Sequence, residues 1–314
     1  MGVSGNTVSS FFQSLVAAST DANQVLVGTN SLIDAVYVDY APVAAAKFST
    51  ISIPIPVSVT SQVSDMSSGK ATFTAVNAGT KPVSLANHPQ YGFVISDFEQ
   101  YRTDEQLVNV FIKPGIAAVA ENANGAIAAL LSSANLTVNP VIATTGSQIA
   151  PTDLIQGYIR LAEQKVPVLD TPNMSFIMPP RVYGNMLPAS SWTQESIASA
   201  ATAIEARRQG MLREAYGSRT AMDQQMPTTG VAPTRTFTSV YMHKYAIALV
   251  SRPLPPAPNN GSNNFCTFTK WKNFSIRITM QYSVEYGGWL VSIEAGFGVA
   301  VIRPEFAQLF STAE

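Results

Sequence analysis

The segment that most restricts the fold is the run of residues 48–59, which alternates apolar residues with polar residues or proline. Its isoleucines and valines would share one face of an extended strand. Pro54 and Pro56 lie on the opposite face, and neither can donate a backbone hydrogen bond, so this strand cannot be central in a sheet. Followed by the turn-rich residues 65–70 and the extended residues 71–76, it predicts a long two-stranded ribbon with a polar tip.

The composition indicates what such a ribbon could lie on. An isolated two-stranded ribbon is marginally stable in water, so it needs a neighbouring surface. Only 12% of the 314 residues are charged, about half of the ~25% that is usual for soluble domains. Hydrophobic residues make up 46%, so the outside must be covered mainly by Ser, Thr, Asn, Gln and Ala. Such a surface suits contact with other protein, and self-assembly is the first prediction.

A long helix is predicted for residues 103–134. The sequence Thr103-Asp-Glu-Gln106 has the spacing of a capping box, which satisfies free backbone amides at a helix start. Apolar residues then recur at steps of three and four from Ile112 to Leu131, which gives one continuous stripe. Pro114 interrupts the pattern and predicts either a kink or a late start.

The rest of the chain predicts a mixed α+β fold whose final third is mostly strand. The single Cys266 is expected to be a small buried residue and fits a reducing compartment. The predicted helices cover residues 152–164, 181–187 and 196–208, and the predicted strands cover 91–96, 174–178, 245–251, 274–282, 289–293 and 298–303.

Few residues suggest catalysis, a cofactor or a metal. His88 and His243 are far apart, each among apolar or aromatic neighbours, and one His with one Cys gives no zinc cluster. The carboxylate pairs at residues 97 and 99 and at 104 and 105 suit a strand face and a helix start. Gly296-Phe-Gly298 lacks the rest of a dinucleotide loop and is interpreted as a strand crossing. We therefore predict that the chain is no enzyme and binds no cofactor or metal.

Two further segments bear on partners. Residues 1–46 are polar and small with apolar clusters such as Phe11 and Phe12, which favours an arm docked on another surface, with disorder as the alternative. Neither a targeting signal nor an apolar run long enough to span a membrane is present. Four arginines between residues 205 and 219 favour a solvated or salt-bridged face over weak contact with nucleic acid. They are Arg207, Arg208, Arg213 and Arg219.

The order of these parts resembles the major capsid proteins of tailed bacteriophages, whose fold is called HK97-like, and among them the P22-type coat proteins. Residues 83–97, 166–179 and 296–305 resemble strand segments of those coats. The resemblance implies an N-arm at 1–46 and an extended E-loop with adjoining strands at 47–102. It also implies a spine helix of the peripheral domain at 103–134, a mostly axial domain with returning strands at 135–273, and closing strands at 274–314.

The resemblance also implies a function. Hexamers and pentamers of one chain would tile an icosahedral phage head around double-stranded DNA, with assembly in the host bacterial cytoplasm. Separate scaffolding and portal proteins would be partners, a decoration protein is a further candidate, and contact with DNA would be weak and non-specific. The alternative is another ring-forming virion component, such as a portal-adjacent or tail protein. The candidate contacts between subunits are Phe11, Phe12, Ile53, Ile55, Asp65 and Lys70.

Overall fold

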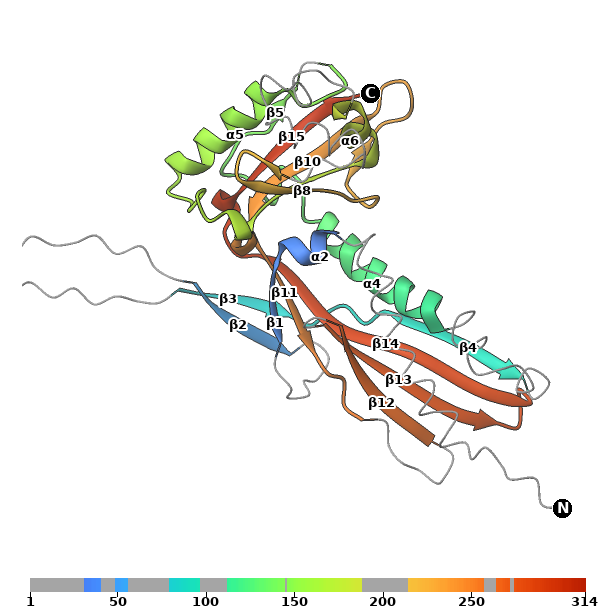
Figure 1. The fold of residues 1–314 in the computed structure, drawn as a ribbon. Helices are drawn as coiled ribbons and strands as arrows, with labels where there is room; N and C mark the ends of the chain where they lie inside the picture. Colours follow the sequence, from blue (N-terminus) through green and yellow to red (C-terminus); the bar gives the residue numbers. More distant parts are fainter. Residues whose placement is uncertain are drawn as a thin grey trace, which may run out of the picture.

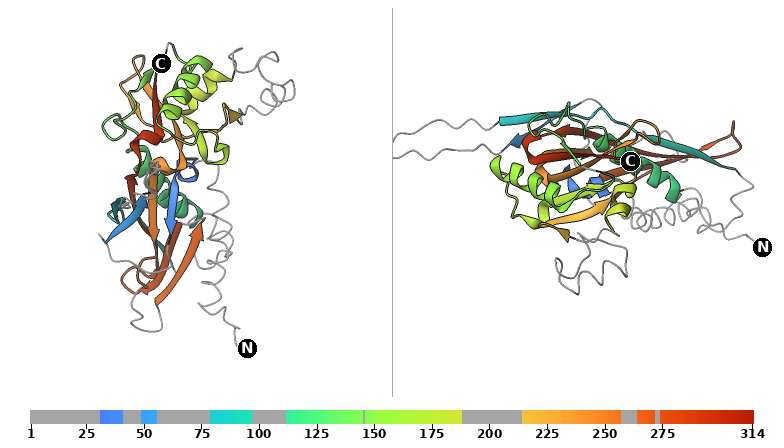
Figure 2. Two further views of the ribbon diagram at one scale, coloured as in Figure 1. Left: turned by 90° about the vertical axis from the view of Figure 1, so that its left-hand side faces the viewer. Right: turned by 90° about the horizontal axis from the view of Figure 1, so that it is seen from above.

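The computed structural model shows two β-sheets placed end to end, with a two-stranded ribbon projecting from one side (Figures 1 and 2). The sheet at the bottom of Figure 1 carries helix α4 (Lys113–Ala128), and we call this half the lower domain. The other sheet carries helices α5 (Pro151–Glu163) and α6 (Pro180–Met186), and we call this half the upper domain. The structure describes residues 31–40, 49–55, 79–96, 112–144, 146–187, 214–256, 264–271 and 274–314.

The lower domain is a six-stranded sheet arranged around its longest strand. Its strands are β1 (Tyr37–Tyr40), β4 (Gln90–Ser96), β11 (Ile247–Arg252), β12 (Asn264–Trp271), β13 (Phe274–Ser283) and β14 (Gly288–Val301). Paired strands follow the order β1-β11-β14-β13-β12. Strand β4 pairs with β14 along the edge opposite to β11, since Asn87, in register with β4, and Ser251 of β11 both pair with Phe297. All pairs are antiparallel except β1 with β11.

The central strand β14 corrects one sequence prediction. Separate strands were expected at residues 289–293 and 298–303, but one continuous strand covers most of both. Gly296 and Gly298 lie inside this strand and do not interrupt it. These glycines instead serve close packing, since a Cβ on Gly298 would lie 2.3 Å from the carbonyl oxygen of Ser84. The interpretation as a strand crossing agrees with this contact and with the mutual backbone hydrogen bonds between Asn87 and Phe297, 3.0 Å each.

Helix α4 buries the predicted apolar stripe against the sheet. Most residues of the stripe are fully or almost fully buried, which confirms that part of the prediction, although Leu130 is only half-buried. The buried ones within or next to the helix are Ile112, Ile116, Val119, Ala123 and Ile127. Within the described residues the helix begins at Lys113 with Pro114 in its first turn, where a missing backbone N–H is tolerated. Residues 103–111, including the predicted capping box, lie outside the described residues.

The end of α4 differs from the prediction. The helix ends at Ala128, six residues before the expected end at residue 134. The amides of Leu130 and Leu131 bond to carbonyls three residues back, so the last turn tightens and the helix stops. Leu131 is nevertheless buried, because the chain turns there toward the upper domain. The apolar pattern therefore continued past the end of the helix.

The upper domain is a seven-stranded sheet covered by two helices. Its strands are β5 (Ile142–Ala143), β6 (Met174–Met178), β7 (Glu214–Ala215), β8 (Ser218–Met222), β9 (Thr228–Thr229), β10 (Thr236–His243) and β15 (Ala307–Ala313). The order is β5-β15-β10-β6-β8-β7, with β9 paired to β10. The predictions of α5, α6 and β6 are confirmed to within two residues. Strands β10 and β15, which form the middle of this sheet, were not predicted.

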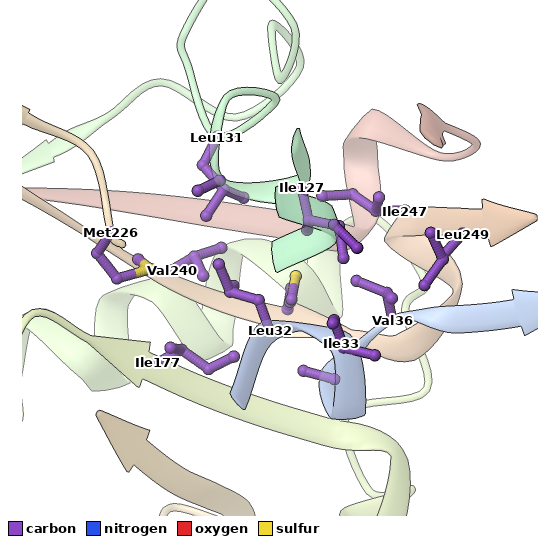
Figure 3. Packing of buried hydrophobic residues seen from close by; sticks show 14 of the residues in the cluster. Leu32, Ile33, Val36, Ile127, Leu131, Ile177, Met226, Val240, Ile247 and Leu249 are labelled. Carbon is purple, nitrogen blue, oxygen red and sulfur yellow. The ribbon is translucent and has the colours of Figure 1, made fainter. Parts of the chain in front are cut away.

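The two domains share one hydrophobic cluster at their junction, which we call the waist. Figure 3 shows its short helix α2 (Ser31–Ala35) lying between side chains from both domains. The labelled members are Leu32, Ile33, Val36, Ile127, Leu131, Ile177, Met226, Val240, Ile247 and Leu249. Because these residues come from both sheets and from α4, the domains are packed together and not merely tethered.

Two of the chain connections that cross the waist are tied to each other. One is the short 3-10 helix η5 (Lys244–Ala246) between β10 and β11, and the other is η6 (Pro304–Phe306) between β14 and β15. The amides of Ile302 and Arg303 both donate to the carbonyl of Ala246, at 2.9 and 3.2 Å. These bonds hold the two crossings side by side.

Candidate functional site

A ribbon of two strands leaves the lower domain near the waist (Figure 1). Strand β2 (Thr50–Ile55) pairs antiparallel with β3 (Gly79–Ser84), and among the described residues β3 is its only strand partner. This agrees with the exclusion of the proline-containing strand from the centre of a sheet. The described part of the returning strand is β3, whereas residues 71–76, predicted to be extended, lie outside the described residues, as do Asp65 and Lys70.

The base of the ribbon packs on its own chain. Ile53 is only 5% exposed and belongs to a small cluster with Val83, Ala248, Val250 and Ile302. The expectation that the ribbon has no surface of its own to pack on is therefore wrong for this base. Ile53 has little surface left for a neighbouring subunit, which corrects its choice as a contact. Ile55 is half-buried and stays a prediction.

A small cavity of about 200 Å³ lies at the root of the ribbon. Its volume is below the ~300–1,000 Å³ of typical small-molecule sites. The rings of Tyr37 and Tyr245 are 5.2 Å apart at one side of it. We interpret it as a gap between the ribbon and the waist. It is lined by Tyr37, Ile53, Pro54, Tyr245, Ile302 and Arg303.

The outer face of the lower sheet, opposite α4, carries a buried carboxylate. Glu294 is 6% exposed and accepts hydrogen bonds from Arg277, from Ser292 Oγ at 2.6 Å and from Gln90 Nε2 at 3.5 Å. His88 Nε2 lies 3.2 Å from Glu294 Oε2. Burial alone would raise the pKa of Glu294, but the bonds from Ser292 and Arg277 and the charge of Arg277 outweigh it and lower the pKa.

Because of these contacts, we expect that replacing Glu294 lowers the unfolding free energy by an amount that depends on pH. The lowered pKa of Glu294 means that its contribution is complete above the ordinary value of 4.5 and is lost as pH falls through the folded-state pKa. Glu294→Gln should lower the unfolding free energy by about 1–2 kcal/mol near neutral pH, with the difference shrinking in acid. Urea unfolding across this range measures it, with the exposed Glu285→Gln as control. A difference that is the same at every pH would contradict the assignment.

Each histidine lies beside one carboxylate in the described part of the chain. His243 is buried, with Nε2 3.4 Å from Asp170 Oδ2, and its Nδ1 accepts the Tyr245 amide at 3.3 Å. Burial lowers the pKa of His243, against the raising effect of Asp170. No group of three or more His, Cys, Asp or Glu side chains that could hold a metal occurs among the described residues. Cys266 is free and half-buried, not fully buried as expected.

Asp223 forms the main polar contact of the waist, and the sequence analysis missed it. The side chain is 1% exposed. Its carboxylate accepts from Ser31 Oγ at 3.0 Å, the Leu32 amide at 3.3 Å, Asn124 Nδ2 at 2.9 Å and the Gln225 amide at 2.9 Å. It therefore joins α2, α4 and the segment after β8. An aspartate between Met and two glutamines gives no local signal of this role.

Most of the predicted contact residues lie outside the described residues. Arg219 is exposed on β8, where its backbone pairs with residues of β6 and β7. The predicted helix at 196–208 and both predicted carboxylate pairs are likewise outside. The contact residues outside the described part are Phe11, Phe12, Asp65, Lys70, Arg207, Arg208 and Arg213.

No protein-family model matches this chain, and no curated protein matches it by sequence. Solved structures do match over nearly its whole length. The capsid structure of the cyanophage P-SCSP1u has a TM-score of 0.57 at 13% identity and covers 90% of this chain and 88% of its own. A structure from Mycobacterium phage Che8 has a TM-score of 0.55 at 16% identity, with 85% of each chain covered. The capsid of Ralstonia phage GP4 has 0.54 at 11%, with 89% and 87% covered.

These likenesses establish the class of fold. The chain has the HK97-like fold of the major capsid proteins of tailed phages, as the order of its parts predicted. The P22-type branch stays a prediction. None of the described helices is both long and apolar enough to cross a membrane.

Proposed function

We propose that this chain is the major capsid protein of a tailed phage and that its copies assemble into the shell of the phage head. The observation that carries the proposal is the shared fold with phage capsid structures over 85–90% of both chains. In this proposal the lower domain is the peripheral domain, α4 is the spine helix, β2 and β3 are the base of the E-loop, and the upper domain is the axial domain. The role is structural and not enzymatic.

The shape and surface of the chain support assembly. Strands β2 and β3 project away from both domains, so the end of this ribbon is placed to reach a neighbouring molecule (Figure 2). Large apolar side chains are exposed at several turns and ends of the described elements, such as Leu169, Val231 and Tyr286. With only 12% charged residues, such a surface is better covered by other copies than by water.

The proposal extends to how the copies are arranged and to partners. Hexamers and pentamers of one chain would tile an icosahedron, in the virion, around double-stranded DNA. Phe11, Phe12, Ile55, Asp65 and Lys70 would contact neighbouring subunits. Separate scaffolding and portal proteins would take part in assembly, and a decoration protein is a further candidate. Arg219, exposed on β8, and the three arginines before it would make weak, non-specific contacts with DNA.

Imaging tests this function directly. Expressed protein, alone and with any scaffolding protein from the same genome, should form closed particles of uniform diameter by negative-stain electron microscopy. Monomers alone, under both conditions, would contradict the proposal. Open rings without closed particles would favour the alternative of a ring-forming virion component.

A further inference from the structure

Strand β12 is the outermost strand on one side of the lower sheet (Figure 1). It pairs with β13 along all eight residues, from Asn264 opposite Gln281 to Trp271 opposite Phe274. Within the described ranges, β13 is the only strand that pairs with it. One row of its backbone N–H and C=O groups has no strand partner among these residues, and such a row is complementary to another extended strand.

Strand β12 itself carries few of the features that protect an edge strand from pairing. Proteins protect edge strands with prolines, bulges, several charges or short length. Strand β12 contains no proline, its register with β13 is uninterrupted, and its one charged residue is Lys270. Phe268, which lies opposite Arg277 and therefore on the outer face, is 42% exposed. An exposed aromatic residue on an edge strand is typical of a contact surface.

The other edges of the same sheet are poorer matches for β12. Strand β1 has four residues, and Arg252 caps it by donating to the Asp39 carbonyl at 3.0 Å and to the Asp39 carboxylate at 2.7 Å. Strand β4 has Gly92 in its middle, which offers no side chain to a cross-strand neighbour. A second β12 matches the first in length and in exposed residues.

We propose that β12 pairs antiparallel with β12 of a second copy across a two-fold axis, with Phe268 facing Phe268. Two identical strands related by a two-fold axis perpendicular to the sheet run antiparallel, and directly opposite residues share one face. With Phe268 on the axis, Thr267 lies opposite Thr269, and Phe265 lies opposite Trp271. Aromatic pairs and Thr–Thr pairs are favourable across antiparallel strands. The inference deepens the proposed function by naming one contact between copies.

Cysteine cross-linking tests the register. In a Cys266→Ser background, Phe268→Cys should give a disulfide-linked dimer after mild oxidation of the assembled protein. Directly opposite Cβ atoms lie about 4.5–5.5 Å apart, whereas a residue and its own copy one step from the axis lie on a diagonal of about 7–8 Å. Thr267→Cys and Thr269→Cys in the same background are therefore matched controls. They should give several-fold less dimer on a non-reducing gel.

A charge substitution tests the same contact without new cysteines. Phe268→Glu should lower self-association, measured by sedimentation velocity, several-fold relative to the wild type. The control is Val284→Glu, which makes the same kind of change at a residue 87% exposed in the turn between β13 and β14. It should leave self-association unchanged.

The outcomes separate this inference from the proposed function. Closed particles without the Phe268→Cys cross-link would overturn the β12 pairing and leave the capsid function standing. A cross-link that forms only when Gly92→Cys is added would assign the contact to β4 and overturn the two-fold pairing. A Phe268→Cys dimer in a protein that forms no particles would support the pairing and overturn the capsid function.

Discussion

Asp223→Ala is expected to lower the unfolding free energy by about 3–5 kcal/mol, the largest effect of any polar substitution proposed for this chain. The carboxylate is buried and accepts hydrogen bonds from the Ser31 hydroxyl, the Asn124 amide group and two backbone amides. Alanine would leave these donors buried without an acceptor, and each such group costs about 1–3 kcal/mol. The loss falls at the waist, where α2 and α4 meet the upper domain.

Urea unfolding of the unassembled chain measures this loss, and hydrogen exchange at the Leu32 amide shows whether α2 is released. Glu121→Ala is the matched control, since Glu121 is exposed on α4 and a surface change of this kind stays within about 0.5 kcal/mol. Equal stabilities of the two variants would mean that Asp223 does not hold the waist together.

Gly298→Val is expected to cost about 3 kcal/mol and to loosen the ribbon from the sheet. A Cβ at Gly298 would lie 2.3 Å from the Ser84 carbonyl oxygen and 2.9 Å from its carbon. Both are backbone atoms at the end of β3, so no side-chain rotation can relieve the clash. The backbone of β3 must move away from β14, and the packing of Ile53 and Val83 of the ribbon against Ala248 and Val250 of β11 would be lost.

Thermal unfolding and limited proteolysis of the ribbon check this prediction. Gly184→Ala is the control, because Gly184 lies in α6 with open space around it. Alanine there should stabilise the helix by about 0.5–1 kcal/mol. A Gly298→Val variant as stable and as protease-resistant as the wild type would contradict the close crossing of β3 and β14.

Local patterns predicted the elements that bury one face. Helix α4 and strand β2 each pack one face against apolar residues and leave the other face exposed. The apolar stripe of the helix and the alternation of the strand follow from this. Strands β10 and β15 were missed because polar side chains fill buried positions of the upper sheet, where alternation fails as a guide. Ser239, His243, Gln308 and Thr312 are all buried in these two strands.

The polar clusters could not have been predicted from spacing along the chain. Asp223 bonds to residues 191 and 192 positions away, and Glu294 bonds to His88 across 206 positions. Only the completed fold brings them together. The burial of Ile53 could not be predicted either. The alternation of its strand indicated an apolar face, but not that residues of β11 would cover that face. Contacts between copies depend on a second chain. Sequence patterns can therefore indicate a surface suited to protein contact, but not which surface it binds.

The central claim is that copies of this chain cover each other's surface in a closed shell. The most direct measurement is the mass of the assembled species, by light scattering or charge-detection mass spectrometry at several protein concentrations. We predict one sharply defined species that contains far more copies than a single ring, in equilibrium with few intermediates. A chain that remains monomeric at the highest concentration, with or without a scaffolding protein, would contradict the claim.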